Sequence, residues 1–385
     1  MANENLGAAK KAKNDEFYTQ YADIEKEMNA YLDYDPDVFR AKTVLLPCDD
    51  PEWSNFTKYF AQNFEKLGLK KLISTSYAPN SKPKEIPYQP ALFELECEKF
   101  DESKSKSNGK IFTLTKDVTK NGVVNFEDLE WDYLSGDGDF RSAEVTELRD
   151  ESDFIITNPP FSLFREFLAW IIQGDKQFSI IGNSNAITYK EVFPLIKENK
   201  IWLGVTRTGV GSMYFYVFEG APEKSGQITQ DGRRMQTIGN SAWFTNIDHG
   251  RRHEPLQLMT MADNLKFSKN AQIKALGYKK YDNYDAIEIP RVEAIPSDYD
   301  GVMGVPITFL GKYNPDQFEI LGMCENEDLY RMKTKRYTTS ECKAAYQAKF
   351  DKPGVYDLNA SGVLNVDGRL EKVYQRILIR HRRSR

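Results

Sequence analysis

The sequence predicts an α/β fold with a twisted, mostly parallel sheet, and three observations support that prediction. Short apolar runs recur along the chain with the length of buried strands. Amphipathic segments with helical spacing lie between several of them, and polar or turn-forming residues end most runs. Strands that alternate with helices are typical of βαβ units, in which helices cover the faces of a parallel sheet. We expect this arrangement in roughly the first two thirds of the chain.

The first βαβ unit is expected between residues 43 and 75. Residues 43–48 (TVLLPC) predict a buried strand, and residues 70–75 (KKLIST) predict a second one. The segment between them places three phenylalanines and a leucine on one face at helical spacing. We expect Ser54 to cap this helix at its start and Gly68 to end it.

Further strands and one clear helix continue the pattern. The run DFIIT predicts a buried strand, and a helix with an apolar stripe is expected to begin near Ser162. The remaining strands of the same sheet are expected at residues 178–183, 200–205, 213–218 and 241–247.

The composition changes near residue 250. Residues 278–315 are rich in Tyr, Asp, Pro and Gly, which is typical of short strands and turns. Residues 369–385 contain seven Lys or Arg and one Glu, and we expect either a phosphate-binding strip or a mobile tail there. We therefore predict two domains, residues 1–250 and residues 251–385.

Composition limits the class of protein. Hydrophobic residues make up 40% of the 385 residues and aromatic residues 13%, which is enough for a sizeable core. The N-terminus lacks the apolar segment of a signal peptide, and no apolar run approaches the ~20 residues of a membrane span. The cysteines are far apart and only three histidines are present, so we predict no metal site and a cytoplasmic protein with reduced thiols. The cysteines are Cys48, Cys97, Cys324 and Cys342.

The chemically informative segment is TNPPF, which follows the predicted strand DFIIT. Each proline fixes its own φ and the residue before a proline is extended, so the chain leaves the strand in a stiff shape. The side chain of Asn158 and the carbonyl of Pro159 can then aim two hydrogen-bond acceptors at one point, with Pro160 holding the turn. The ring of Phe161 adds a stacking face. This combination suits a planar group with an NH₂ on its edge, such as the exocyclic amine of a purine.

The motif NPPF resembles the catalytic motif of methyltransferases that act on the amino group of adenine in DNA. The wider pattern resembles the EcoRI-type adenine-specific DNA methyltransferases. The resemblance runs from about Phe17 to about Gly322, while residues 323–368 match less clearly. The segments that carry it are FYTQYADIEKEM, LLPCDDPEWSNF, GDGDFRSAEV, TNPPFSLFREF, GNSNAITYKEVFPLI, GVPITFLGKYNPDQFEILG and, near the end, RILIRHR.

The resemblance implies a Rossmann-like methyltransferase fold with a smaller C-terminal target-recognition region. It also implies S-adenosylmethionine as the methyl donor and adenine in double-stranded DNA as the acceptor, reached by base flipping. A separate restriction endonuclease is a possible partner. In most such enzymes a glycine-rich loop follows the first strand, but here the loop is DDPEWSNF. The residues that we expect to contact the donor are Asp49, Asp50, Ser54, Asn55, Phe56, Asp137, Asp139, Phe140 and Tyr18.

Pairs of basic residues are the candidates for contact with DNA. They are Arg233, Arg234, Arg251, Arg252, Lys279 and Lys280. The net charge of −5 does not indicate a nucleic-acid binder, but net charge hides the distribution of charge. Two alternatives remain: an enzyme of the same fold that acts on RNA or a protein amide, and an inactive methyltransferase-like module that only binds DNA. A donor-binding measurement separates the second alternative from an enzyme.

Overall fold

The computed structural model describes residues 18–49, 54–78, 101, 103–206, 213–216, 227–230, 232–237 and 240–382. The contacts divide the chain into two compact units, Met1–Gly250 and Arg251–Arg385. The division falls where the composition of the sequence changes. Each unit is described by itself.

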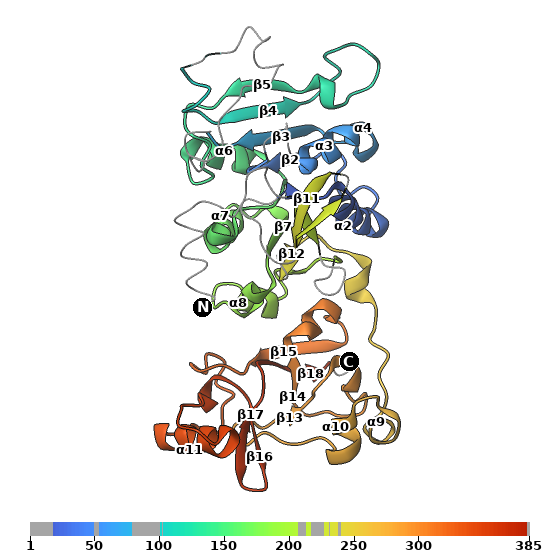
Figure 1. Ribbon diagram of the computed structural model, residues 1–385. Helices are drawn as coiled ribbons and strands as arrows, with labels where there is room; N and C mark the ends of the chain where they lie inside the picture. Colours follow the sequence, from blue (N-terminus) through green and yellow to red (C-terminus); the bar gives the residue numbers. More distant parts are fainter. Residues whose placement is uncertain are drawn as a thin grey trace. The chain divides into compact units, whose positions relative to one another are not determined.

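The first unit is built on an eight-stranded sheet, shown in the upper part of Figure 1. Its strand order is β5-β4-β3-β2-β6-β7-β12-β8. The strands are β2 (Thr43–Leu46), β3 (Lys71–Ser76), β4 (Lys110–Leu114), β5 (Glu130–Tyr133), β6 (Phe154–Thr157), β7 (Gln177–Asn183), β8 (Trp202–Leu203) and β12 (Ser241–Thr245).

The centre of this sheet is parallel and its two edges are antiparallel. Strand β2 pairs in parallel with β3 on one side and with β6 on the other, and β6 pairs in parallel with β7. Strands β4 and β5 at one edge, and β12 and β8 at the other, run antiparallel to their neighbours. The predicted α/β fold with a mostly parallel centre is confirmed, and the antiparallel edges are an addition to it.

Helices cover both faces of the sheet, with α2, α3 and α4 on one side and α6, α7 and α8 on the other (Figure 1). The predicted cap at Ser54 is confirmed, since its side chain accepts a hydrogen bond from the backbone N–H of Phe56 at 3.1 Å. The single helix predicted from Ser54 to Gly68 is divided at Asn63 into α3 and α4, and Gly68 ends α4 in the left-handed conformation with φ of 62°. The helices are α2 (Tyr21–Tyr34), α3 (Asn55–Gln62), α4 (Phe64–Leu67), α6 (Ala143–Glu151), α7 (Phe164–Gln173) and α8 (Phe193–Lys197), with short 3₁₀ turns η2 (Phe126–Asp128), η3 (Phe161–Leu163) and η4 (Ser184–Thr188).

An aromatic-rich core lies between α2, α3 and the sheet. Helix α2 buries Ile24, Met28 and Tyr31, at helical spacing, and each is 0% exposed. Phe39 packs edge-on against Phe154 of β6, with 5.1 Å between ring centroids. Aromatic pairs of this geometry stabilise a core beyond the area that they bury. This packing holds β2 and β6, the two strands that matter for the site, in a fixed position.

A second, smaller sheet in the first unit has the order β1-β9-β11-β10. Its strands are β1 (Tyr18–Thr19), β9 (Tyr214–Tyr216), β10 (Gln227–Gln230) and β11 (Arg233–Thr237). The strand predicted at residues 213–218 therefore exists as β9, but the expectation that it belongs to the main sheet is wrong. It pairs instead with β1, which comes from the start of the chain, and periodicity within a strand cannot report its partner.

The second unit contains a four-stranded sheet, order β13-β14-β18-β15, and a two-stranded hairpin. Short strands and 3₁₀ turns occupy residues 278–315, as the sequence predicts. The sheet strands are β13 (Ile287–Glu288), β14 (Met303–Pro306), β15 (Phe318–Met323) and β18 (Arg376–His381), and the hairpin strands are β16 (Val363–Val366) and β17 (Arg369–Lys372). The helices are α9 (Met261–Phe267), α10 (Ala271–Leu276) and α11 (Thr339–Phe350), and the 3₁₀ turns of this region are η5 (Gly250–His253), η6 (Val292–Ala294), η7 (Ile307–Lys312) and η8 (Leu358–Ala360).

The basic C-terminal segment is part of this sheet. Strand β18 lies between β14 and β15, so the expectation of a mobile tail is wrong for residues 376–381. The Arg376 guanidinium is buried and pairs with Glu288 at 2.6 Å, and Arg380 pairs with Glu319 at 2.9 Å. Within the described ranges, no helix is long and apolar enough to span a membrane.

Candidate active site

The candidate site lies at the carboxyl ends of β2 and β6. The chain proceeds from β2 to β3 on one side, and β6 is then added on the other side of β2. The strand order therefore reverses between β2 and β6. In open α/β sheets ligands bind at such a switch point, outside the carboxyl ends of the strands. Asp49 follows β2 and Asn158 follows β6, so the two main candidates from the sequence flank this point.

Asp49 joins the ends of three segments. It is 7% exposed, and its carboxylate accepts hydrogen bonds from the Ser54 hydroxyl at 2.6 Å and from the Thr157 hydroxyl at 2.5 Å. Its backbone carbonyl accepts a hydrogen bond from the hydroxyl of Ser74 on β3. Because each carboxylate oxygen has two acceptor sites, these bonds leave capacity for a ligand's donors. The charge is thus fixed in place beside the switch point.

The residues that open α3 have different surroundings. Ser54 is buried as the N-cap and donates to Asp49, and Phe56 packs in the core with its ring 5.9 Å from that of Trp243. Asn55 is half-buried, and its amide NH₂ donates to the backbone carbonyl of Thr19 at 2.8 Å. Of these three predicted donor contacts, Asn55 is the one whose side chain lies nearer the surface.

The GDGD turn is held against the end of β3 by close backbone approach. Gly138 has φ of 82°, and a Cβ on it or on Gly109 would collide with the carbonyl oxygen of Ser76. The carbonyl of Asp137 accepts a hydrogen bond from the backbone N–H of Ala78 at 2.8 Å. These contacts place Asp137 and Asp139 at the same edge of the sheet as Asp49, one strand further along.

Asp139 is engaged by a guanidinium. Arg141 donates to both of its oxygens, from Nε at 2.9 Å and from Nη2 at 2.6 Å, and the Tyr77 hydroxyl donates at 3.2 Å. The hydrogen bonds from Arg141 hold the pKa of Asp139 below its ordinary value, although burial opposes this. Burial and then the charge of Asp139 raise the pKa of Tyr77. Asp139 is therefore a fixed anion that retains acceptor capacity.

Phe140 has the contacts of a core residue. It is 5% exposed, and its ring centroid lies 4.9 Å from that of Phe167 and 5.6 Å from that of Trp170. The Arg141 guanidinium lies 5.4 Å from the ring centroid. This packing explains the position of Phe140 without a ligand, and its stacking on a donor ring stays a prediction.

Asn158 follows β6 directly and is half-buried. Its amide NH₂ donates to the hydroxyl of Thr19 at 3.3 Å. Pro159 is buried, and Pro160 has φ of −54° and ψ of 124°, so the chain leaves the strand in the extended form expected of two prolines. Phe161 begins the 3₁₀ turn η3 and packs against the edge of the aromatic-rich core.

Two predicted donor contacts lie outside what the structure describes. Asp50 is not among the described residues, and the backbone of Tyr18 is described in β1 but its side chain is not. Their predicted roles stay predictions.

The basic pairs do not behave alike. Arg233 and Arg234 lie on β11, where Arg234 is half-buried and the side chain of Arg233 is not described. Arg251 is half-buried, whereas Arg252 is only 6% exposed. Among the lysines, Lys279 is half-buried and Lys280 is exposed, 3.8 Å from the carboxylate of Asp285.

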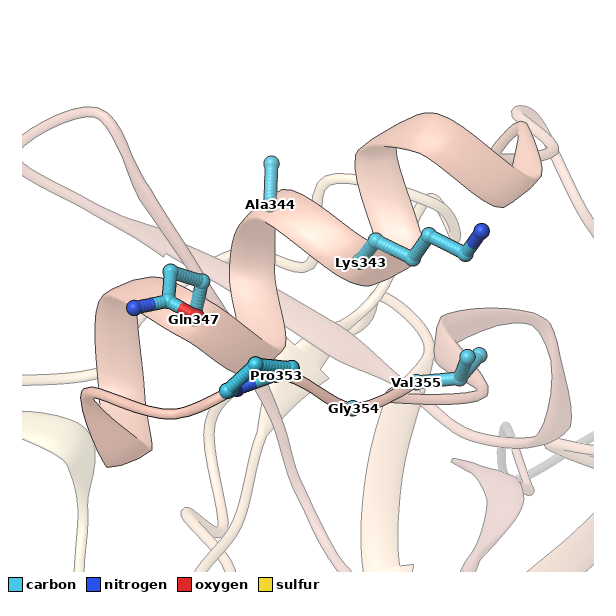
Figure 2. Close-up of a pocket in the computed structure, with 6 residues that line it drawn as sticks. All are labelled: Lys343, Ala344, Gln347, Pro353, Gly354 and Val355. Carbon is cyan, nitrogen blue, oxygen red and sulfur yellow. The ribbon is translucent and has the colours of Figure 1, made fainter.

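The second unit has a surface hollow beside α11, shown in Figure 2. Three residues of the helix and three of the loop that follows it line the hollow, and Lys343 and Gln347 supply its polar side chains. The hollow belongs to a different unit from Asp49 and Asn158. The full lining is Lys343, Ala344, Gln347, Pro353, Gly354 and Val355.

Sequence reasoning missed three residues that shape the site. Thr157 is adjacent to Asn158, and its place at the end of a buried strand was a usable signal. Arg141 follows GDGDF, and a basic residue directly after an acidic turn was a weaker signal. Thr19 is 139 residues before Asn158 in the sequence, and no local pattern identifies their contact.

The fold and the site together define a class of protein. A sheet with a parallel centre carries an acidic residue at one side of its switch point and an Asn-Pro-Pro-Phe turn at the other. This arrangement is that of a methyltransferase that acts on amino groups.

Comparison with known proteins identifies the family. Residues 5–382 match the family model described as "Adenine-specific methyltransferase EcoRI". The chain is 46% identical over 325 residues to the type II methyltransferase M.EcoRI of Escherichia coli. This alignment covers 83% of this chain and 89% of the relative. It is 34% identical over 340 residues to M.MpnI of Mycoplasma pneumoniae, with 86% and 90% covered. It is 32% identical over 382 residues to M.MgeORF184P of Mycoplasma genitalium, with 98% of each covered. No solved structure matches the chain.

The chain belongs to the EcoRI family of adenine-specific type II DNA methyltransferases. Membership implies in general terms that S-adenosylmethionine is the methyl donor and that DNA is the substrate.

Proposed function

We propose that this enzyme transfers a methyl group from S-adenosylmethionine to the N6 amine of adenine in double-stranded DNA, with Asn158 and Pro159 as the groups that receive the amine. The supporting observation is the place of Asn158 at the end of β6, across the switch point from Asp49. The family is adenine-specific, which favours this substrate over RNA bases and protein amides.

The donor set at the site suits this cofactor. S-adenosylmethionine is cationic and carries an amino group, ribose hydroxyls and an adenine amine, all of which are served by acceptors. Asp49 and Asp139 supply two carboxylates at the carboxyl edge of the sheet. Asp137, Asn55 and Asp50 are the further residues that would hold it. When bound, the cofactor supplies a methyl group on an electrophilic sulfonium.

The chain's own residues prepare the nucleophile. The lone pair of the adenine amine is delocalised into the ring, which makes it a poor nucleophile. Hydrogen bonds from the NH₂ to the Asn158 oxygen and the Pro159 carbonyl favour a pyramidal nitrogen whose lone pair is freer. Holding that nitrogen in one place adds a proximity effect of up to ~7–11 kcal/mol. The amine nitrogen becomes cationic as it gains the methyl group and then releases a proton to water, so no general base is required for this step.

The target base must leave the duplex to reach these acceptors. Flipping a base out of the stack costs a few kcal/mol. Phe161, next to the proline turn, offers an aromatic face on which the base can stack, and stacking of this kind returns ~1–3 kcal/mol per base. We propose that Phe161 has this role.

We also propose that the second unit, Arg251–Arg385, contributes to recognition of the target sequence. Its exposed and half-buried basic residues Arg251, Lys279 and Lys280 support contact with phosphates, as does Arg234 on β11 of the first unit. A restriction endonuclease that cuts the same sequence would act separately. We leave Arg252 out of the proposed contacts because it is buried.

The proposal is tested by incubating the enzyme with DNA and labelled S-adenosylmethionine, digesting to nucleosides and mapping the sequence that carries N6-methyladenine. We expect label in N6-methyladenine within one short recurring sequence. With Asn158→Ala we expect loss of methyl transfer, while the fold and donor binding are retained, because only the amine's acceptor is removed. Label in a different nucleoside, or near wild-type turnover of the variant, would contradict the proposed function.

A further inference from the structure

Thr19 connects the proposed catalytic asparagine to the start of α3. Its hydroxyl accepts a hydrogen bond from the amide NH₂ of Asn158 at 3.3 Å, and its backbone carbonyl accepts one from the amide of Asn55 at 2.8 Å. Thr19 is 3% exposed. Thr19 thus contacts both Asn158, which is proposed to receive the target amine, and Asn55, which is proposed to lie beside the methyl donor.

The orientation of the Asn158 amide decides whether it can act. An amide side chain has an oxygen, which accepts hydrogen bonds, and an NH₂, which donates them. A target NH₂ needs the oxygen. In the structure the NH₂ of Asn158 is directed at Thr19, so the oxygen, which lies in the same plane, points away from the NH₂ across the Cβ–Cγ axis. A partner that holds the NH₂ end therefore fixes the direction in which the oxygen points.

Thr19 is itself held by backbone contacts. It lies in β1, where it pairs with Phe215 of β9, a residue that is 0% exposed. The next residue, Gln20, donates from its side chain to the carbonyl of Tyr214 at 2.8 Å. The hydroxyl of Thr19 is consequently a rigid reference point rather than a mobile surface group.

We propose that Thr19 is a positioning residue for methyl transfer, and that its hydroxyl holds the Asn158 amide with the oxygen directed at the target amine. This inference rests on the proposed function of Asn158. Thr19 does not touch the reacting atoms and acts only through the asparagine.

A crossed pair of substitutions tests the proposal. Thr19→Val keeps the shape and volume of the buried side chain but removes the hydroxyl. Thr19→Ser keeps the hydroxyl but loses a buried methyl group. The backbone carbonyl that receives Asn55 is present in both variants, so the contact with α3 is unchanged. The readouts are the single-turnover rate of methylation, affinity for S-adenosylmethionine and for DNA, and the midpoint of thermal unfolding.

We expect Thr19→Val to be the slower of the two variants in methylation and Thr19→Ser to be the less stable of the two. Thr19→Val should slow single-turnover methylation about tenfold, because the Asn158 amide loses the hydrogen bond that orients it, with both affinities within about twofold of wild type. Thr19→Ser should retain the rate within about twofold, although it should unfold at a lower temperature than Thr19→Val. Thr19→Ala, which also lacks the hydroxyl, should be as slow as the valine variant.

Thr245 provides a matched control. It lies on β12, two strands from β6, and is 0% exposed. Its hydroxyl donates to the carbonyl of Phe178 on β7 at 2.7 Å. Thr245→Val should lower stability and leave the methylation rate within about twofold. A rate for Thr19→Val equal to wild type, or rates that follow stability across the variants, would overturn the role of Thr19. If Asn158→Ala were active, the proposed function itself would fail, so the two failures are distinguishable.

Discussion

Asp139 illustrates how a single charged group is fixed at the candidate site. Its two carboxylate oxygens face the two donor nitrogens of Arg141, and the Arg141 guanidinium also reaches Glu166 at 3.1 Å. Bidentate pairs of this kind set direction as well as energy. The side chain of Asp139 is 19% exposed, so water screens the pair only partly. The acidic turn therefore keeps one carboxylate in a defined place before any ligand binds.

We expect Asp139 to make the stability of the enzyme depend on pH. Its folded pKa is lowered by Arg141, so the folded state binds the proton less tightly than the unfolded state. Its contribution is therefore complete above the unfolded pKa of about 3.9 and is lost as the pH falls through the lower folded value. Denaturant unfolding of wild type and Asp139→Asn between pH 2 and pH 7 measures this. The advantage of wild type should be constant above about pH 5 and should shrink below about pH 4. An advantage that grows as the pH falls would contradict this account.

The residues that sequence reasoning found and missed differ in the range of their contacts. Ser54 and Gly68 were predictable because a helix cap depends on its own turn of helix. Asp49 and Asn158 were predictable because each follows a buried strand, and strand ends meet at one edge of the sheet. Thr19 was not predictable, since its contact with Asn158 depends on how β1 is paired with a strand from much later in the chain.

Helix α2 is anchored by a carboxylate in its buried face. Glu27 is 0% exposed and accepts hydrogen bonds from the Tyr31 hydroxyl at 2.8 Å and from the backbone N–H groups of Val205 and Thr206 at 3.0–3.1 Å. Burial raises the pKa of Glu27, while the donors oppose that shift. A Cβ on Gly204 would collide with this carboxylate, so the glycine is needed for the approach. Glu27 therefore ties α2 to the residues that follow β8.

We expect Glu27→Gln to lower the free energy of unfolding by ~1–3 kcal/mol. An amide oxygen in the place of Oε2 can still accept from both backbone N–H groups, but the NH₂ in the place of Oε1 then lies beside the N–H of Val205, and the Tyr31 hydroxyl must change from donor to acceptor. Chemical denaturation measures the change. Glu25→Gln on the same helix is the control, because Glu25 is exposed and should change stability by less than ~0.5 kcal/mol. Equal effects of the two substitutions would show that the buried bonds of Glu27 contribute little.

The strands at the edges of the main sheet were harder to predict than those at its centre. The parallel strands β2, β3, β6 and β7 are largely buried, and each contains a short apolar run that a sequence shows directly. Strand β8 has only two residues, Trp202 and Leu203, within the six that were expected. The antiparallel direction of β12 follows from its pairing with β7, and pairing direction is not written in the pattern of one strand.

At the scale of the whole molecule, the enzyme must bind a highly charged polymer although its net charge is −5. We expect Arg234→Gln to weaken DNA binding similarly on cognate and scrambled duplexes, because a phosphate contact carries little sequence information. The slope of log affinity against log salt should fall in magnitude by about 0.9. Binding isotherms at several salt concentrations measure both effects.

Arg40→Gln serves as the control for this measurement. Arg40 is exposed and pairs with Asp37 at 2.5 Å. It precedes β2 and therefore lies at the amino end of that strand, whereas Asp49 lies at the carboxyl end. Its removal should leave the salt slope unchanged. If Arg234→Gln also leaves slope and affinity unchanged on both duplexes, Arg234 does not contact DNA. If it weakens only the cognate duplex, by ~1–3 kcal/mol, it reads a base instead.

The small sheet that contains β1 has a consequence for the order in which the enzyme is made. Tyr18 and Thr19 leave the ribosome early, but their partners Tyr216 and Phe215 follow about 200 residues later, a long-range pairing that is slow to form. The main parallel strands β2, β3 and β6 are synthesised in between. A nascent chain can therefore assemble most of the main sheet while β1, which carries Thr19, is still without its partner strand β9. On this account newly made enzyme cannot reach its full rate of methylation before β9 has emerged and β1 has paired with it.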